Sequence, residues 1–100
     1  MPKSVVLSAS GAVKLSDLLE YLEQGWSKKV KDDFIKKLDR SVDRISKYPK
    51  SCPESKKYPG LFQCVVTKQT SLFYRVRKKE IEIITLFDTR QDPTKIKRSK

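Results

Sequence analysis

The apolar residues of this chain change their spacing near its middle, and that change limits the folds open to it. Between Ala12 and Ile45 they recur every three or four residues, which is the period of amphipathic helices. Between Leu61 and Phe87 they form short alternating runs of β-branched and aromatic residues, which are typical of strands. A chain of 100 residues is long enough for one domain with a modest core. The pattern therefore predicts an α+β domain in which helices cover one face of a small sheet.

The helical half is expected to form two helices that fold back on each other. The first is predicted from about Ala12 and stops at Gly25. The second begins after Ser27, a suitable N-cap, and ends before Pro49, because the residue before a proline disfavours the α conformation. So short a connection predicts an antiparallel helix hairpin, with Trp26 packed at its turn. A short N-terminal strand, "SVVLSA", comes before the hairpin.

Three strands are predicted after the helices. The polar stretch 49–60 contains three prolines and a glycine and is expected to be a loop. The strands follow near residues 61–68, 71–78 and 80–87, and their short connections predict a three-stranded antiparallel meander. Neither connection contains Asn-Gly or Asp-Gly, so the registers stay open.

Turns at residues 69–70 and 78–79 would give the sheet two unlike faces. One face, with Val65, Leu72, Tyr74 and Ile83, is apolar enough to receive the helices. The opposite face is expected to be partly exposed and to bind a partner, because large exposed apolar patches on small domains are often binding sites. Alternatively, cross-strand ion pairs keep that face in water while its apolar residues lie under the loop or the tail. The residues assigned to it are Phe62, Cys64, Val66, Phe73, Arg75, Arg77, Ile84 and Leu86.

The net charge of +11 favours an acidic partner. Lys and Arg number 23 against 12 Asp and Glu. Such a charge attracts nucleic acid, a ribosome or an acidic protein over long range. A basic, frayed tail is expected at residues 94–100 and suggests a plain nucleic-acid-binding module as another reading, although such tails are often only solvated.

The composition also narrows the chemistry. The chain has no histidine, which removes Ser-His, Cys-His and His-metal mechanisms. Glycine occurs only at positions 11, 25 and 60, so no phosphate-binding loop motif is present. Cys52 and Cys64 form no paired metal motif, and no metal or other cofactor is expected. Without a recognisable signal or a membrane-length apolar segment, we expect a cytoplasmic protein with reduced cysteines.

Several short motifs together resemble a known family. Ala12, Leu18, Leu22, Val30, Phe34, Leu38, Ile45 and Pro49 are followed by "GLFQCVV", "LFYRV" and "LFDTRQDP". In this order they are similar to the RelE/ParE superfamily of bacterial type II toxins, over about residues 8–93. The resemblance implies one toxin domain at residues 1–93 and a cognate antitoxin, acidic and partly disordered when free, that holds the toxin inactive.

Two branches of this superfamily imply two targets. RelE-like members cleave messenger RNA on the ribosome, and ParE-like members poison DNA gyrase. Cleavage needs a base, an acid and cations for the phosphate. Arg90 matches the RelE-type arginine and Lys68 could contact phosphate, but Ser71 stands where a second arginine is expected, and no tyrosine follows Tyr74.

The incomplete set favours the gyrase-binding branch and leaves the ribonuclease as the alternative. Under a purely structural reading, Arg90 pairs with Asp88 or Asp92. The residues predicted to bind partners are Phe73, Arg75, Arg77, Ile84, Leu86 and Arg90.

Overall fold

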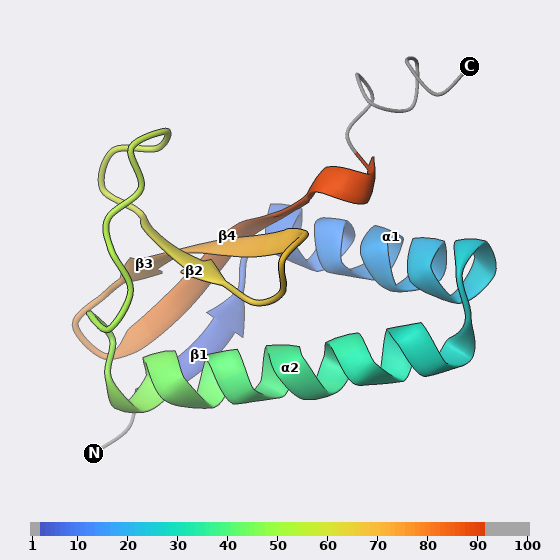
Figure 1. The fold of residues 1–100 in the computed structure, drawn as a ribbon. Helices are drawn as coiled ribbons and strands as arrows, with labels where there is room; N and C mark the ends of the chain where they lie inside the picture. The colour runs from blue at the N-terminus through green and yellow to red at the C-terminus, as the bar shows by residue number, and fades with distance from the viewer. Residues whose placement is uncertain (1–2, 92–100) are drawn as a thin grey trace.

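A computed structural model of the chain describes residues 3–91, which form two helices against a four-stranded sheet. The elements follow the predicted order of strand, helix hairpin and three-stranded meander, so the α+β prediction is confirmed (Figure 1). The predicted tail at residues 94–100 lies outside the described residues. The strands and helices are β1 Ser4–Leu7, α1 Ala9–Gly25, α2 Lys28–Lys47, β2 Phe62–Val65, β3 Thr70–Val76 and β4 Glu80–Asp88, followed by the short 3-10 helix η1 Thr89–Gln91.

Serine caps begin both helices. The Ser8 hydroxyl accepts a hydrogen bond from the Gly11 amide at 2.9 Å, so α1 begins three residues earlier than predicted and shortens the first strand. The Ser27 hydroxyl accepts from the Val30 amide at 3.1 Å, as its predicted capping role requires. Helix α2 ends at Lys47, before Pro49, as the sequence predicts.

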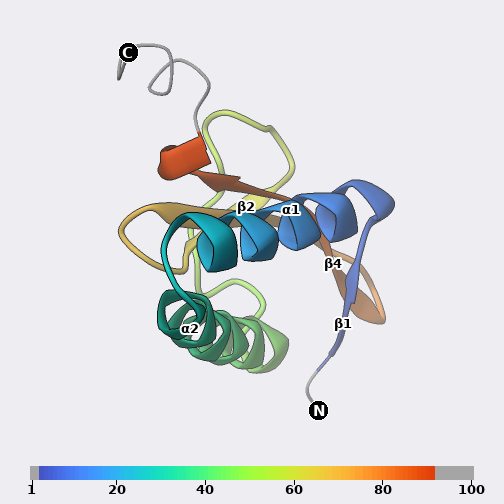
Figure 2. The ribbon, with the colours of Figure 1, turned by 90° about the vertical axis from the view of Figure 1, so that its right-hand side faces the viewer.

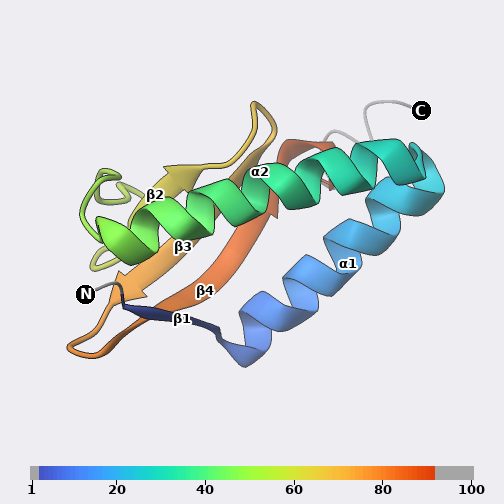
Figure 3. The same ribbon diagram turned by 90° about the horizontal axis from the view of Figure 1, so that it is seen from below.

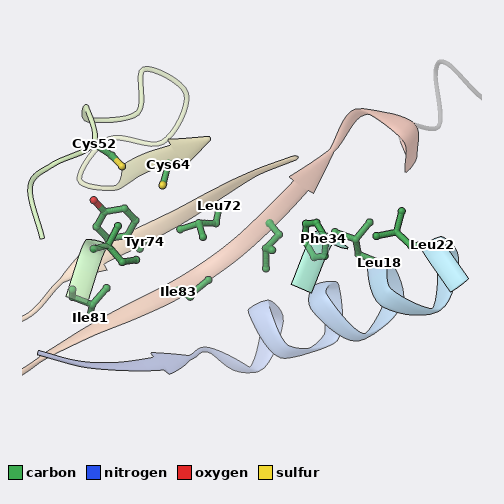
Figure 4. Close-up of a cluster of buried hydrophobic side chains, with 11 residues drawn as sticks. Leu18, Leu22, Phe34, Cys52, Cys64, Leu72, Tyr74, Ile81 and Ile83 are labelled. Carbon is green, nitrogen blue, oxygen red and sulfur yellow. The ribbon is translucent and has the colours of Figure 1, made fainter. Parts of the chain in front are cut away.

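The two helices lie on the same face of the sheet (Figures 2 and 3). The sheet order is β1-β4-β3-β2, in which β1 is parallel to β4 and the remaining pairs are antiparallel. The core lies between the layers (Figure 4). Its fully buried members include Leu18 and Leu22 from α1, Ile45 from α2, and Leu72 and Ile81 from the sheet.

The register of β2 differs from the predicted one and reverses its faces. Phe62 lies opposite Tyr74 and Cys64 opposite Leu72, a shift of three residues from turns at 69–70. An odd shift moves every side chain to the other face. Cys64 is therefore buried against the helices, whereas Val65 points to solvent. The predicted assignment of these two residues is wrong because the connection spans residues 66–69 rather than two residues.

A β-bulge changes the faces of β4. Arg75 lies opposite Glu82, but the register shifts between Phe73 and Tyr74, because Phe73 pairs with Thr85 and Tyr74 with Ile83. The extra residue, Ile84, is left between these pairs. A bulge reverses the inward and outward alternation beyond it. Leu86 therefore faces the core, contrary to the prediction.

Candidate partner-binding site

The face of the sheet opposite the helices presents a mixed apolar and polar surface, here called the outer face. It holds two exposed apolar side chains, Val65 and Phe87, and two exposed cations, Arg75 and Arg77. The Gln63 side-chain amide donates to the Ser71 hydroxyl at 3.3 Å across β2 and β3. The residues of the outer face are Gln63, Val65, Ser71, Phe73, Arg75, Arg77, Glu82, Thr85 and Phe87.

Part of the outer face is covered by the proline-containing loop. The rings of Tyr58 and Phe73 pack edge to face, with centroids 5.0 Å apart. Lys57 places its ammonium 5.4 Å from the Tyr58 ring and 5.5 Å from the Phe87 ring. The loop thus adds an aromatic ring and a cation to the surface that it borders.

The structure corrects the predicted membership of the partner-binding surface. Phe73 is only 4% exposed, because Tyr58 covers it, and Leu86 is 6% exposed within the core. Ile84 is half-buried at the bulge. The prediction that Phe73 and Leu86 lie on an exposed surface is therefore wrong. Sequence analysis missed Val65 and Phe87, the apolar residues that do lie there.

Arg75 and Arg77 are both exposed at the end of β3. The Arg77 backbone amide donates to the Glu80 carbonyl at 2.8 Å, whereas its guanidinium pairs with the Glu82 carboxylate at 2.7 Å, diagonally across the strands. Within residues 3–91, Arg75 forms no ion pair, although it lies opposite Glu82. Its charge is thus presented to solvent on the outer face.

Arg90 lies in a half-buried network. Its Nε and Nη2 donate to the two carboxylate oxygens of Asp88 at 3.0 and 2.8 Å, and its backbone amide donates to the same group at 2.8 Å. The Thr70 hydroxyl also donates to Asp88, and the Tyr21 hydroxyl donates to the Arg90 carbonyl at 3.2 Å. The Trp26 ring lies 5.8 Å from the guanidinium and is 56% exposed. Trp26 thus stacks on Arg90 instead of packing inside the hairpin turn as predicted.

The network changes the acidity of both members. Burial opposes ionisation of Asp88, but the hydrogen bonds from Arg90 and Thr70 outweigh it and hold the pKa of the carboxyl below its ordinary value. The hydrogen bond to Asp88 raises the pKa of Arg90. The side chain of Asp88 is 1% exposed and that of Arg90 18%. The pair is therefore a largely desolvated ion pair.

Lys68 is exposed in the turn between β2 and β3, at the same end of the sheet as Arg90. The Thr89 amide donates to the Gln69 carbonyl at 2.9 Å and joins this turn to η1. A cleft of about 190 Å³ opens here, lined by Lys37, Gln69 and Arg90 among others. Lys68 and Arg90, the two residues assigned to a ribonuclease, thus lie at the same end of the sheet. The Arg90 guanidinium, however, donates its hydrogen bonds to the Asp88 carboxylate.

A cluster that the sequence did not reveal lies beneath the loop. The Arg44 guanidinium donates to Cys52 Sγ at 3.2 Å and to Cys64 Sγ at 3.0 Å, and both cysteines are buried and free. Figure 4 shows them with Tyr74 at one end of the core. Burial raises the pKa of Cys64 to about 11. The residues come from α2, the loop and β2, so no local motif could have predicted their contact.

Two classes of site find no support among the described residues. Residues 3–91 hold no group of three or more acidic, cysteine or histidine side chains arranged to bind a metal ion. In that same range, neither helix has the length and apolar character needed to cross a membrane.

The fold and this surface define a small toxin-like α+β domain, and comparison with known proteins gives its family. The sequence model of the ParE toxin of the type II toxin-antitoxin system parDE matches residues 5–93. The chain belongs to this family. No curated protein sequence matches it significantly.

Solved structures share the fold. The chromosomal ParDE system from P. aeruginosa superposes with a TM-score of 0.71 at 16% identity, over 86% of this chain and 95% of that chain. The YoeB/ParE toxin from Agrobacterium tumefaciens gives 0.59 at 14% identity, over 85% and 96%. The DinJ-YafQ toxin-antitoxin complex of E. coli gives 0.58 at 10% identity, over 93% and 99%. At such identities these likenesses concern the fold alone.

Proposed function

We propose that this ParE-family chain arrests growth by binding DNA gyrase and that a cognate antitoxin neutralises it. The observation that carries the choice of target is the Asp88–Arg90 ion pair. Arg90 is the residue that matches the ribonuclease pattern, and both guanidinium donors described above are directed at a buried carboxylate. A guanidinium that is hydrogen-bonded in this way stabilises the end of the sheet instead of binding an RNA phosphate.

The other residues considered for RNA cleavage do not supply a general acid and a general base. Ribonucleolytic cleavage requires a group that removes the 2'-hydroxyl proton and another that protonates the leaving oxygen. Lys68 is an exposed lysine in a turn, Ser71 lies on the outer face, and the chain has no histidine. Inhibition by binding needs only a complementary surface, which the outer face offers.

The antitoxin of this proposal is acidic and partly disordered before it binds. Support comes from the net charge of +11 and from the outer face, which carries the exposed Arg75 toward one end and the exposed Val65 and Phe87 toward the other. The toxin domain corresponds to residues 1–93, of which the family model matches 5–93. Because both proposed partners, DNA gyrase and the antitoxin, are cytoplasmic, the proposal also implies a cytoplasmic location for this protein.

Purified toxin should inhibit DNA supercoiling by gyrase in a concentration-dependent manner, and added antitoxin should restore supercoiling. Induction of the toxin alone should stop growth. Normal supercoiling at saturating toxin, with a preparation that still arrests growth, would refute the choice of target.

A ribosome-dependent mRNA endonuclease is the second candidate, favoured by the cleft that Lys37, Gln69 and Arg90 line next to Lys68. Primer extension on translated messages should then reveal cuts that require the toxin. A Lys68→Ala variant should abolish the cuts if the lysine contacts phosphate. Growth arrest without such cuts would exclude this function.

A further inference from the structure

A second hollow lies at the end of the molecule away from Arg90, where α2 meets the N-terminal segment. It is open to solvent, has a volume of about 680 Å³, and is bordered by Lys3, residues 47–51 and Val76. Its size lies within the range of ligand-binding pockets, roughly 300–1,000 Å³. It is called the lysine-rimmed pocket below, because lysines supply its charged side chains.

Hydrogen bonds hold the walls of the lysine-rimmed pocket in place. The Lys3 amide donates to the Ser46 carbonyl at 3.0 Å, and the Ser46 hydroxyl donates to the Lys3 carbonyl at 2.6 Å. The Tyr74 hydroxyl reaches out of the core to the Pro49 carbonyl at 2.7 Å. The Ser51 amide closes a turn on the Tyr48 carbonyl at 3.0 Å. The pocket therefore exists before any partner arrives, which lowers the entropy cost of binding.

The lining between these walls is mainly apolar. Tyr48 is 67% exposed, the largest exposure among the large hydrophobic residues that the structure describes. Pro49 and Val76 lie beside it and are half-buried. Exposed tyrosines beside an apolar hollow are typical anchoring points of protein interfaces. The hollow suits one apolar side chain inserted from outside.

Positive charge surrounds this apolar lining. Lys3, Lys47 and Lys50 line the pocket. The Lys3 ammonium donates to the carbonyls of Arg77 and Lys78 at 2.6 and 3.2 Å, which fixes the basic turn 77–79 against the pocket. Two carboxylates nearby are already paired: Asp43 lies 3.3 Å from Lys47, and Glu82 pairs with Arg77. Glu80, opposite Ser4, is outnumbered by the lysines of the rim and by the basic turn 77–79. The field at the rim therefore attracts carboxylates.

We propose that the lysine-rimmed pocket binds an acidic peptide segment of a partner protein, with an aliphatic side chain against Tyr48 and Val76. Carboxylates on either side of that side chain pair with Lys3 and Lys50. The identity of the partner, which is the antitoxin, rests on the proposed function; the rest of the inference does not.

The positive charge and the apolar lining of the pocket argue against two other occupants, a second copy of the chain and a nucleic acid. A second copy of the chain would bring another +11 charge to a basic rim, so the two copies would repel each other. A nucleic-acid backbone would be satisfied by cations alone and would gain little from the apolar Pro49 and Val76. An acidic segment with an aliphatic residue uses both features.

Fluorescence anisotropy with the full-length toxin tests the proposal. The probe is a fluorescein-labelled nonapeptide, DEELEDLDE, compared with DEEGEDGDE of equal charge and with a uridine nonanucleotide. The leucine peptide should bind about tenfold more tightly than the glycine peptide. Tyr48→Ala should remove that difference, and Lys50→Glu should weaken binding of the leucine peptide by about tenfold or more. Lys36→Glu, which makes the same charge change at an exposed position of α2, is the matched control.

Three results would overturn the proposal: equal binding of the two peptides, equal weakening by Lys36→Glu and Lys50→Glu, or tighter binding of the oligonucleotide than of the leucine peptide. Circular dichroism of each variant verifies the fold. Gyrase inhibition and growth arrest are measured in parallel. A wild-type toxin that inhibits gyrase but fails the peptide test would refute the pocket alone, whereas peptide binding without gyrase inhibition would refute only the proposed target.

Discussion

Replacement of Arg90 by leucine should destabilise the fold substantially, because the residue neutralises a buried carboxylate. Arg90 donates Nε and Nη2 to Asp88 at 3.0 and 2.8 Å, and the Asp88 side chain is 1% exposed. Hydrogen bonds to charged groups contribute about 1.5–3 kcal/mol, and breaking a buried ion pair costs about 3–5 kcal/mol. Asp88 keeps its hydrogen bonds from the Thr70 hydroxyl and from the backbone. The free energy of unfolding should therefore fall by about 2–3 kcal/mol.

Urea unfolding followed by circular dichroism measures this loss. The free energy of unfolding is extrapolated linearly to zero urea. Fluorescence of Trp26 is unsuitable, since its ring lies beside the substituted residue. The melting temperature should fall by about 10–20 °C, given roughly 4–8 °C for each kcal/mol in a domain of this size. The matched control is Arg75→Leu, an exposed arginine without an ion pair in residues 3–91, which should change stability by no more than about 0.5 kcal/mol.

A double-mutant cycle with Asp88→Asn separates the pair from its surroundings. If the ion pair is the source of the stability, the two substitutions should be coupled by about 1.5 kcal/mol or more. The reasoning would be refuted by additive effects, or by an Arg90→Leu variant as stable as Arg75→Leu. A residue that serves only to contact RNA would give that second result.

Three further predictions concern pH and close packing. The pKa of Asp88 in the folded protein lies below its ordinary 3.8. The ionised carboxylate therefore stabilises the fold above that pH, and this contribution is lost as the pH falls further. Asp88→Asn should lack this acid-dependent loss in thermal melts. Burial raises the pKa of Cys64 from 9.0 to about 11, so stability should fall as pH rises through this window, and Cys64→Ala should flatten the decline in urea titrations. A flat wild-type profile in either range would contradict the assignment. Gly11→Ala should cost about 1–3 kcal/mol in urea unfolding, since the new Cβ would lie 2.7 Å from the Ile83 carbonyl oxygen. Gly25→Ala, with no atom nearer than 3.8 Å, should cost nothing, and equal losses would contradict the packing argument.

Local patterns predicted the elements well. The three-to-four spacing and the Ser27 cap anticipated α2, Pro49 its end, and the alternating runs the meander. Helical period and capping depend on residues a few positions apart, so they can be read along the chain. The family resemblance, built on short motifs, was also confirmed by the match to residues 5–93.

The surface prediction succeeded only in part. Arg75 and Arg77 are exposed as expected, but Phe73 and Leu86 are buried. Leu86 turns inward because of the bulge at Ile84, and Phe73 is buried because Tyr58 of the loop covers it. Neither the bulge nor this loop contact has a strong sequence signal. The partner-binding role of the exposed residues stays a prediction.

The sequence by itself determined the order and type of the elements, the basic charge and the family, because these depend on composition and local periodicity. Tertiary structure alone decided which side chains face outward, how deeply the Arg90–Asp88 pair is buried, and where the lysine-rimmed pocket forms. Lys3, Tyr48 and Val76 meet there from distant parts of the chain. Such contacts depend on strand register and helix placement, which are set by packing across the whole core and not by neighbours along the chain.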